Sequence, residues 1–282
     1  MAVRLVTDST VDISPEQARA LGITIVPLTV FFGDEAFLDG VELDNASFYR
    51  KLAASKALPR TSQPSPAAFQ EAYMRLIDEG ADAILSVHLS AKLSGTYQSA
   101  CTARDTLPES AKKIPIDIVD SQNISVGMSL PIMQATKEAK EGLGLEEIKT
   151  HLLDTLARTH ILAVLDTLEY LRRGGRIGGA AAFLGSMLSV KPIVSLKEGE
   201  VIAVERPRTR SKAYERVAQL VSEMGSIEHI SVAESDEEVG QQLAGVLRKT
   251  YHGDLPIYKL GAVLGTHTGP GTAAVAVIVA KP

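Results

Sequence analysis

The sequence predicts an α/β fold in two domains, a parallel-sheet α/β domain at residues 1–155 and an α+β domain with a mixed sheet at residues 156–282. In the first half, short apolar segments without alternation each precede a segment of helical periodicity. This order is typical of a parallel sheet covered by helices on both faces. In the second half, the turn KEGE joins two apolar segments and predicts a hairpin, so part of the second sheet is antiparallel.

The first domain is expected to alternate strand and helix from its first residues. Strands are predicted at 3–9, 23–33, 83–87 and 116–121, and helices at 14–22, at 45–55, from Ser65, after Ser94 and after Ser125. Ser65 precedes a proline, as a helix cap commonly does. A helix over 145–159 then leads out of this domain, which places the boundary near residue 155.

The second domain has a different order of elements. Strands are predicted at 161–166, 192–196, 201–206, 229–235, 256–261 and 273–280, and helices at 211–224 and 237–251. Because hairpin-linked and helix-linked strands occur together, a mixed sheet is expected.

The composition of the chain excludes several classes of binding partner and of protein. The formal net charge is -5, so the chain has no general attraction for nucleic acid or an anionic membrane, and no nucleic-acid partner is expected. The single cysteine, Cys101, excludes an internal disulfide. The N-terminus enters a strand pattern at once and no apolar run approaches the length of a membrane span, so we expect a cytoplasmic protein.

No metal or cofactor is expected. The histidines have neither HxH nor HExxH spacing, and a second cysteine for a metal site is lacking. The sequence has no GxxxxGK-S/T phosphate loop, and the glycines at 174–179 do not follow a strand in the way that a dinucleotide fingerprint requires.

An anion site is predicted where the strand at 83–87 meets the helix that follows it. Ser90, Ser94, Thr96 and Ser99 supply more hydroxyl groups than a helix cap requires, at a point where free backbone N–H groups and the helix dipole converge. Gly95 is expected to let a ligand approach the backbone closely. Ligands of parallel sheets bind beyond the carboxyl ends of the strands, which agrees with this position.

Two other segments supply candidate groups. Thr61 and Ser62 stand just before a helix that already has a complete cap, and His267 lies in a Gly/Pro-rich segment, 265–272, that we expect to be a loop. Glycines beside a histidine leave room for a ligand to reach its side chain, so we expect His267 to belong to a binding site.

A hydrolase or acyltransferase is the alternative from another class. A Ser–His–Asp triad would have to be assembled from Ser94, His267 and either Asp8 or Asp120, which are far apart in the sequence. The G-x-S-x-G elbow that would support such a nucleophile is absent.

Two basic clusters complete the set of candidates. Both are expected at helix starts, where cations oppose the helix dipole and an anionic partner would offset the cost. The clusters are Arg172, Arg173 and Arg176, followed by Arg206, Arg208, Arg210 and Lys212.

Taken together, these segments resemble the DegV family, the bacterial fatty-acid-binding proteins also called FakB. The matching segments span nearly the whole chain in order and are VTDSTVDIS, TSQPSPAAF, LSAKLSGTYQSA, IVDSQNISVGMSL, LEYLRRGGRIGG, KPIVSL, ERPRTRSKA and HTGPGT. The family pattern often has lysine where Arg172 and Arg173 stand here.

The resemblance implies that one long-chain fatty acid is held between the two domains. It implies that the carboxylate is bound by Thr61, Ser62 and Ser94, with His267 nearby, and we add Gly95 and Thr96 to this group. It also implies a separate kinase, FakA, that phosphorylates the bound acid to acyl phosphate. We expect Arg172, Arg173, Arg176 and Arg206 to dock that kinase or contact the phosphoryl group, and we expect the tail pocket not to depend on them. A lipid-binding regulator that does not deliver its lipid stays open, as does transient contact with a membrane for lipid exchange.

Overall fold

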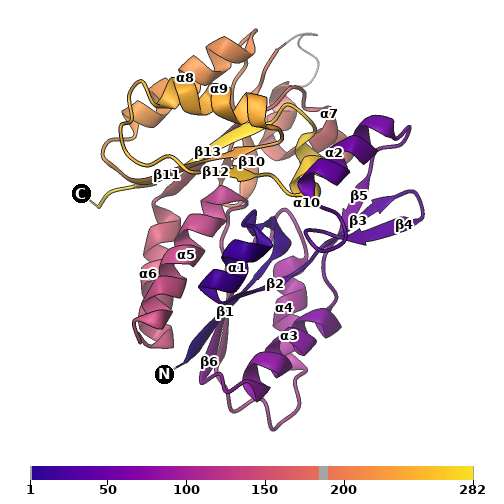
Figure 1. Cartoon of the computed structure of the whole chain (residues 1–282), viewed down its shortest axis with the longest axis vertical. Helices are drawn as coiled ribbons and strands as arrows, with labels where there is room; N and C mark the ends of the chain where they lie inside the picture. Colours follow the sequence, from indigo (N-terminus) through magenta and orange to yellow (C-terminus); the bar gives the residue numbers. More distant parts are fainter. Residues whose placement is uncertain (1, 184–189, 282) are drawn as a thin grey trace.

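A four-stranded parallel sheet forms the centre of the N-terminal half (Figure 1). The computed structural model describes residues 2–183 and 190–281. The sheet has the order β2-β1-β6-β7, with β1 at Val3–Asp8, β2 at Ile23–Val26, β6 at Ala83–His88 and β7 at Ile116–Asp120. The predicted parallel sheet is therefore confirmed for these four segments.

Helices cover both faces of this sheet, as predicted. One core cluster packs α1 (Pro15–Leu21), α5 (Val126–Lys140) and α6 (Leu145–Ala157) on one face. A second cluster packs α3 (Pro66–Asp78) and α4 (Thr96–Asp105) on the other face. Because β1, β6 and β7 are neighbours, the loops after them meet at one edge of the sheet.

The predicted strand at 23–33 is confirmed for Ile23–Val26 but is wrong as one continuous strand, because the chain leaves the parallel sheet at Pro27. Residues Thr29–Phe32 form β3, which pairs antiparallel with β4 (Glu35–Leu38) and β5 (Arg60–Ser62) in a separate sheet. Proline has no N–H for a ladder, and the next N–H, that of Leu28, donates to Ser9 Oγ instead. Helix α2 (Asn45–Ala54) follows β4 in the chain.

A six-stranded mixed sheet forms the centre of the C-terminal half. Its order is β10-β9-β8-β13-β11-β12, and β11 and β12 are its parallel pair. The strands are β8 (Thr159–Val164), β9 (Ile193–Lys197), β10 (Glu200–Glu205), β11 (Ile227–Glu234), β12 (Ile257–Lys259) and β13 (Ala273–Val279). The predicted hairpin is confirmed: Glu198 and Gly199 have φ of 51° and 79°, as a type I′ turn requires.

The two faces of this sheet carry different side chains. Helices α8 (Arg210–Glu223) and α9 (Glu237–Leu247) cover the outer face, where Val275 and Val277 of β13 join their core (Figure 1). Ala274 and Ala276 alternate with these valines and face inward, toward α5 and the N-terminal half. Alanine on the inner face leaves room that valine would fill.

Short helices line the junction of the two halves. They are η1 (Ser9–Val11), α7 (Glu169–Arg173), η2 (Gly178–Phe183) and α10 (Ala262–Thr268). Although α10 comes late in the chain, its Ala262 and Val263 pack with Val30 and Phe48 of the N-terminal half. The expected loop at 265–272 is therefore wrong in its first part, because Gly265–Thr268 form the end of α10.

Candidate functional site

A cavity of about 280 Å³ lies where the inner face of the six-stranded sheet meets the carboxyl edge of the parallel sheet. Its wall is largely apolar and draws on both halves of the chain. The apolar lining consists of Leu28, Leu89, Leu93, Ile124, Ile161, Ala163, Leu165, Leu171, Val194, Leu196, Val201, Leu260, Val263, Leu264 and Ala274. Such a wall is suited to a hydrocarbon chain.

Several hydroxyl groups in the wall are already occupied by protein partners. Ser125 Oγ donates to Asp12, Ser195 Oγ to the Ile161 carbonyl, and Thr268 Oγ1 to the Leu264 carbonyl. Because their hydrogens are used in these bonds, these groups add little polarity to the cavity.

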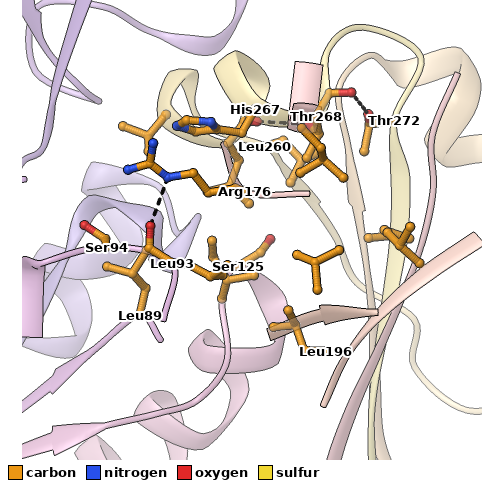
Figure 2. Close-up of a pocket in the computed structure, with 18 of the residues that line it drawn as sticks. Leu89, Leu93, Ser94, Ser125, Arg176, Leu196, Leu260, His267, Thr268 and Thr272 are labelled. Carbon is orange, nitrogen blue, oxygen red and sulfur yellow. Dashed lines mark hydrogen bonds between the residues drawn. The ribbon is translucent and has the colours of Figure 1, made fainter. Parts of the chain in front are cut away.

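Thr61, Ser62, Ser94, Arg176 and His267 gather at one part of the wall, which we call the polar end of the cavity. Figure 2 shows Ser94, Arg176 and His267 on one side and Leu196 farther along. Ser62 and the neighbouring Gln63 are exposed, so the polar end reaches the protein surface. Four of these five residues, all except Arg176, were predicted to bind a carboxylate.

His267 and Thr61 are hydrogen-bonded across 206 positions of sequence. The distance from Thr61 Oγ1 to His267 Nε2 is 2.8 Å, and His267 Nδ1 has no partner. Burial, aided by the charge of Arg176, lowers the pKa of His267 to about 4, so the ring is neutral near pH 7. Because Nδ1 has no partner, the favoured tautomer is the one that carries no hydrogen on Nδ1, since a buried N–H group without an acceptor would be destabilising. The Nε2–H group then donates to Thr61 Oγ1, and the Thr61 hydroxyl hydrogen is left for an acceptor in the cavity.

Glycine at 174 allows His267 to occupy this position. A Cβ on Gly174 would lie 2.3 Å from His267 Nδ1, closer than any side chain permits. Gly174 also fixes the cation of the polar end, because its carbonyl accepts from Arg176 Nη1 at 2.6 Å while Arg176 Nε donates to the Leu93 carbonyl at 3.1 Å. These bonds hold Arg176 between the segments that carry Ser94 and His267.

Ser94 lies just before α4, with its Oγ 2.9 Å from Thr96 Oγ1. Thr96 is fully buried and, like Gly95, is not among the cavity-lining residues. A Cβ on Gly95 would meet the Gln63 side chain at 2.6 Å, so the close approach expected at this glycine is made by Gln63. Thr96 therefore supports Ser94, because its N–H also donates to Ser94 Oγ at 3.3 Å.

Arg176 lines the cavity at its polar end, so of the two roles expected for the arginines its position suits contact with the head group better than docking of a kinase. Arg172 and Arg173 are in the last turn of α7, where cations favour the helix dipole, so the electrostatic argument for a helix start does not hold for them. Both pair with Glu169 and are exposed. The Arg206 guanidinium lies 4.8 Å from the centre of the Phe183 ring.

The triad of the hydrolase alternative is not assembled among the described residues. Asp8 accepts from Thr10, His88 and the Leu89 N–H, and Asp120 accepts from the backbone of Ala91 and Gln122. His267 therefore has neither carboxylate as a partner, and its Nδ1 is unpaired.

Sequence reasoning missed the inner face of the six-stranded sheet. Ala163 and Ala274 line the cavity while their neighbours in sequence face the outer helices. The alternation of alanine with valine in AAVAVIVA is the signal that could have found this wall.

The fold and the cavity define an α/β protein with two central sheets and, between them, a largely apolar cavity whose polar end carries hydroxyl groups and the Arg176 cation. The chain belongs to the DegV family, described as uncharacterised proteins, whose model matches residues 2–280. It is 38% identical over 275 residues to a DegV domain-containing protein of Halalkalibacterium halodurans, covering 96% of each chain.

Solved structures of the family superpose on the whole chain. A DegV family protein from Thermus thermophilus, described by its fatty acid binding, is 36% identical, with a TM-score of 0.89 over 99% of this chain and 100% of that one. A stearic-acid-binding protein from Eubacterium ventriosum is 28% identical, with a TM-score of 0.91 over 98% of each chain. In the part of the chain that the structure describes, no helix is both long enough and apolar enough to span a bilayer.

Proposed function

We propose that this protein binds one long-chain fatty acid in the cavity and presents its carboxylate to a separate kinase, which converts it to acyl phosphate. The observation that carries the proposal is the division of the cavity into an apolar wall and a polar end that reaches the surface. The fatty-acid-binding relatives from Thermus thermophilus and Eubacterium ventriosum, which share the fold over the whole chain, support the choice of ligand.

The polar end has the groups that a carboxylate needs. Thr61, Ser62 and Ser94 offer hydroxyl donors, and Arg176 offers a positive charge. A hydrogen bond from a neutral group to a charged one contributes about 1.5–3 kcal/mol. We infer that these groups set the position of the head group.

The tail supplies most of the affinity. Burial of about fifteen methylene groups at about 0.8 kcal/mol each gives roughly 12 kcal/mol before the costs of association. Because this is several times the gain from one head-group hydrogen bond, the tail determines affinity and the head group determines orientation.

Presentation to a kinase explains why the head group would lie at the surface. The kinase transfers a phosphoryl group from ATP to the carboxylate oxygen, and cations near the transferring group favour that step. Arg172, Arg173 and Arg206 are candidates for docking the kinase, and Arg176 for contacting the head group. We propose that the protein acts in the cytoplasm, without nucleic acid or a cofactor, and exchanges lipid through transient contact with a membrane.

A coupled phosphorylation assay tests delivery. Arg173→Ala and Arg206→Ala should keep bound fatty acid near the wild-type amount while acyl-phosphate formation with kinase and ATP falls sharply. Arg75→Ala is the matched control, because Arg75 is an exposed helical arginine that faces Glu79 at i+4, as Arg173 faces Glu169 at i−4. Unchanged acyl-phosphate formation in both variants would contradict docking at these arginines. Wild-type protein that binds fatty acid but yields no acyl phosphate with kinase and ATP would favour a lipid-binding regulator without delivery.

A further inference from the structure

Three side chains from the N-terminal half hold the start of α10. Asn45 Nδ2 donates to the Leu260 carbonyl at 2.5 Å, the Gly261 N–H donates to Asp12 Oδ1 at 2.8 Å, and the Ala262 N–H donates to Asp39 Oδ1 at 2.9 Å. Five residues beyond Ala262, the same helix carries His267 to the polar end. The position of His267 therefore depends on these bonds.

Asp12 joins this attachment to the cavity wall. Its second oxygen, Oδ2, accepts from Ser125 Oγ at 2.5 Å, and both Ser125 and Leu260 line the cavity. The Gly261 backbone packs closely against both carboxyl groups. A Cβ on Gly261 would lie 3.1 Å from Asp12 Oδ1 and 3.4 Å from both carboxylate oxygens of Asp39. The two carboxyl groups thus enclose the Gly261 backbone.

Both carboxyl groups are buried, and within residues 2–183 and 190–281 neither has a lysine or arginine as an ion-pair partner. Burial raises the pKa of Asp12 to about 8, opposed by the bonds from Ser125 and Gly261 and increased by the charges of Asp39 and Asp8. Burial likewise raises the pKa of Asp39 to about 6. Near pH 7 the pair therefore holds about one proton, mainly on Asp12.

Other titratable groups surround the pair. Asp8 of β1 is bonded to His88, and the buried hydroxyl group of Tyr49 of α2 lies nearby. A second pocket, beside Asp12 and Asp39, is also lined by Arg19 of α1, Asp44 before α2, and Tyr258 and Lys259 of β12. His267, at the other end of α10, is neutral above about pH 4 and does not titrate between pH 6 and 8.

We propose that Asp12 is a positioning residue that holds the start of α10 to the N-terminal half most firmly while its carboxyl group is neutral, and that ionisation of this buried group beside Asp39 loosens α10 and speeds release of the bound fatty acid. The second part rests on the proposed function; the first does not. A solvated aspartate has a pKa near 4, whereas the pKa of Asp12 is about 8 while α10 is held in place. The population with α10 loosened therefore increases as the pH rises from 4 to 8 and becomes constant above pH 8. Asp39 contributes similarly, but only up to about pH 6.

Between pH 6 and 8, Asp12 alone sets this dependence, and two pH units correspond to a change of at most about 100-fold in the loosened population. Asp12→Asn removes the titration while keeping the bonds, because an amide oxygen accepts from Gly261 and an amide N–H donates to Ser125 Oγ. Ser125→Ala removes a bond that favours the charged form, so it should move the transition above about pH 8.

The first readout is amide hydrogen exchange of 262–268 in delipidated full-length protein, corrected for the intrinsic pH dependence of exchange. We expect protection to fall at least tenfold from pH 6 to 8 in the wild type and in Asp34→Asn, an exposed aspartate in the β3–β4 turn, and to stay constant in Asp12→Asn. Constant protection in the wild type, or an equal fall in Asp12→Asn, would overturn the proposal. If Asp12→Asn does not fold, an unshifted transition in Ser125→Ala overturns it.

The second readout is the rate at which a fluorescent fatty acid leaves the loaded protein for phospholipid vesicles. The ratio of wild-type to Asp12→Asn rates should rise about tenfold or more from pH 6 to 8, and a constant ratio would refute the coupling to release. A protein that shows the exchange result but binds no fatty acid would contradict the proposed function and leave the fastening of α10 intact.

Discussion

Ala274→Leu should shorten the fatty acid that the cavity accepts. Ala274 is 3% exposed, lies on the inner face of β13 and packs with Ile161, Leu260 and Leu264 beside the cavity. Leucine adds three carbon groups that would enter the cavity space. If they exclude about three methylene groups of the tail, affinity for an acid that fills the cavity falls by about 2.4 kcal/mol, or roughly 60-fold.

The assay is displacement of a fluorescent fatty acid by saturated acids of increasing length. Acids about four carbons shorter than the longest tight-binding acid should bind the variant and the wild type equally, because their tails do not reach the added side chain. Ala276→Leu is the control, since Ala276 is on the same face of β13 but is not a lining residue. Overpacking there should lower stability by about 1–3 kcal/mol without changing the length preference.

Two results would refute this reasoning. Equal affinity of Ala274→Leu and wild type for every chain length would mean that the tail lies elsewhere. An equal loss at every length, with the melting temperature unchanged, would mean that position 274 acts through the head group.

Three further predictions concern the polar end and its support. Thr61→Val and Ser94→Ala should each weaken binding by about 1–3 kcal/mol in a titration while the melting temperature stays close to the wild-type value; unchanged affinity in the double variant would place the head group elsewhere. Gly174→Ala should displace the His267 ring and weaken binding at least as much as His267→Ala, and full affinity would show that the ring position is unimportant. His88→Ala removes the buried ring that bonds both Asp8 and Ser86, leaving Asp8 with Thr10 and Leu89, and it opens a cavity; it should lower the free energy of unfolding by about 3–5 kcal/mol in urea, with bound lipid kept in the folded fraction, and a loss under 1 kcal/mol would contradict a structural role.

The regular elements were predictable because they depend on local patterns. The strands β6 and β7 and the hairpin at 197–200 follow from apolar runs and turn residues, and the structure has them near the predicted bounds. The exception at Pro27 is also local in origin, but the partner of β3 is set by tertiary packing that a single strand pattern does not encode.

The site was less predictable, since it depends on contacts between distant segments. Thr61 and His267 meet only because α10 packs on the antiparallel sheet of the N-terminal half, and nothing in the segment 265–272 indicates that packing. Their grouping was expected from the resemblance to the DegV family and not from spacing. Arg176 was assigned to kinase docking or phosphoryl contact and not to carboxylate binding, because a glycine-rich segment does not reveal that its arginine folds back onto the Leu93 carbonyl.

The most direct test of the account is mass spectrometry of lipid extracted from denatured, freshly purified protein, with the amount compared to the protein concentration. Long-chain fatty acid should be recovered at close to one molecule per chain, because a buried tail of this size leaves slowly. Protein that contains no fatty acid, and that still fails to bind long-chain fatty acid added after purification, would contradict the account.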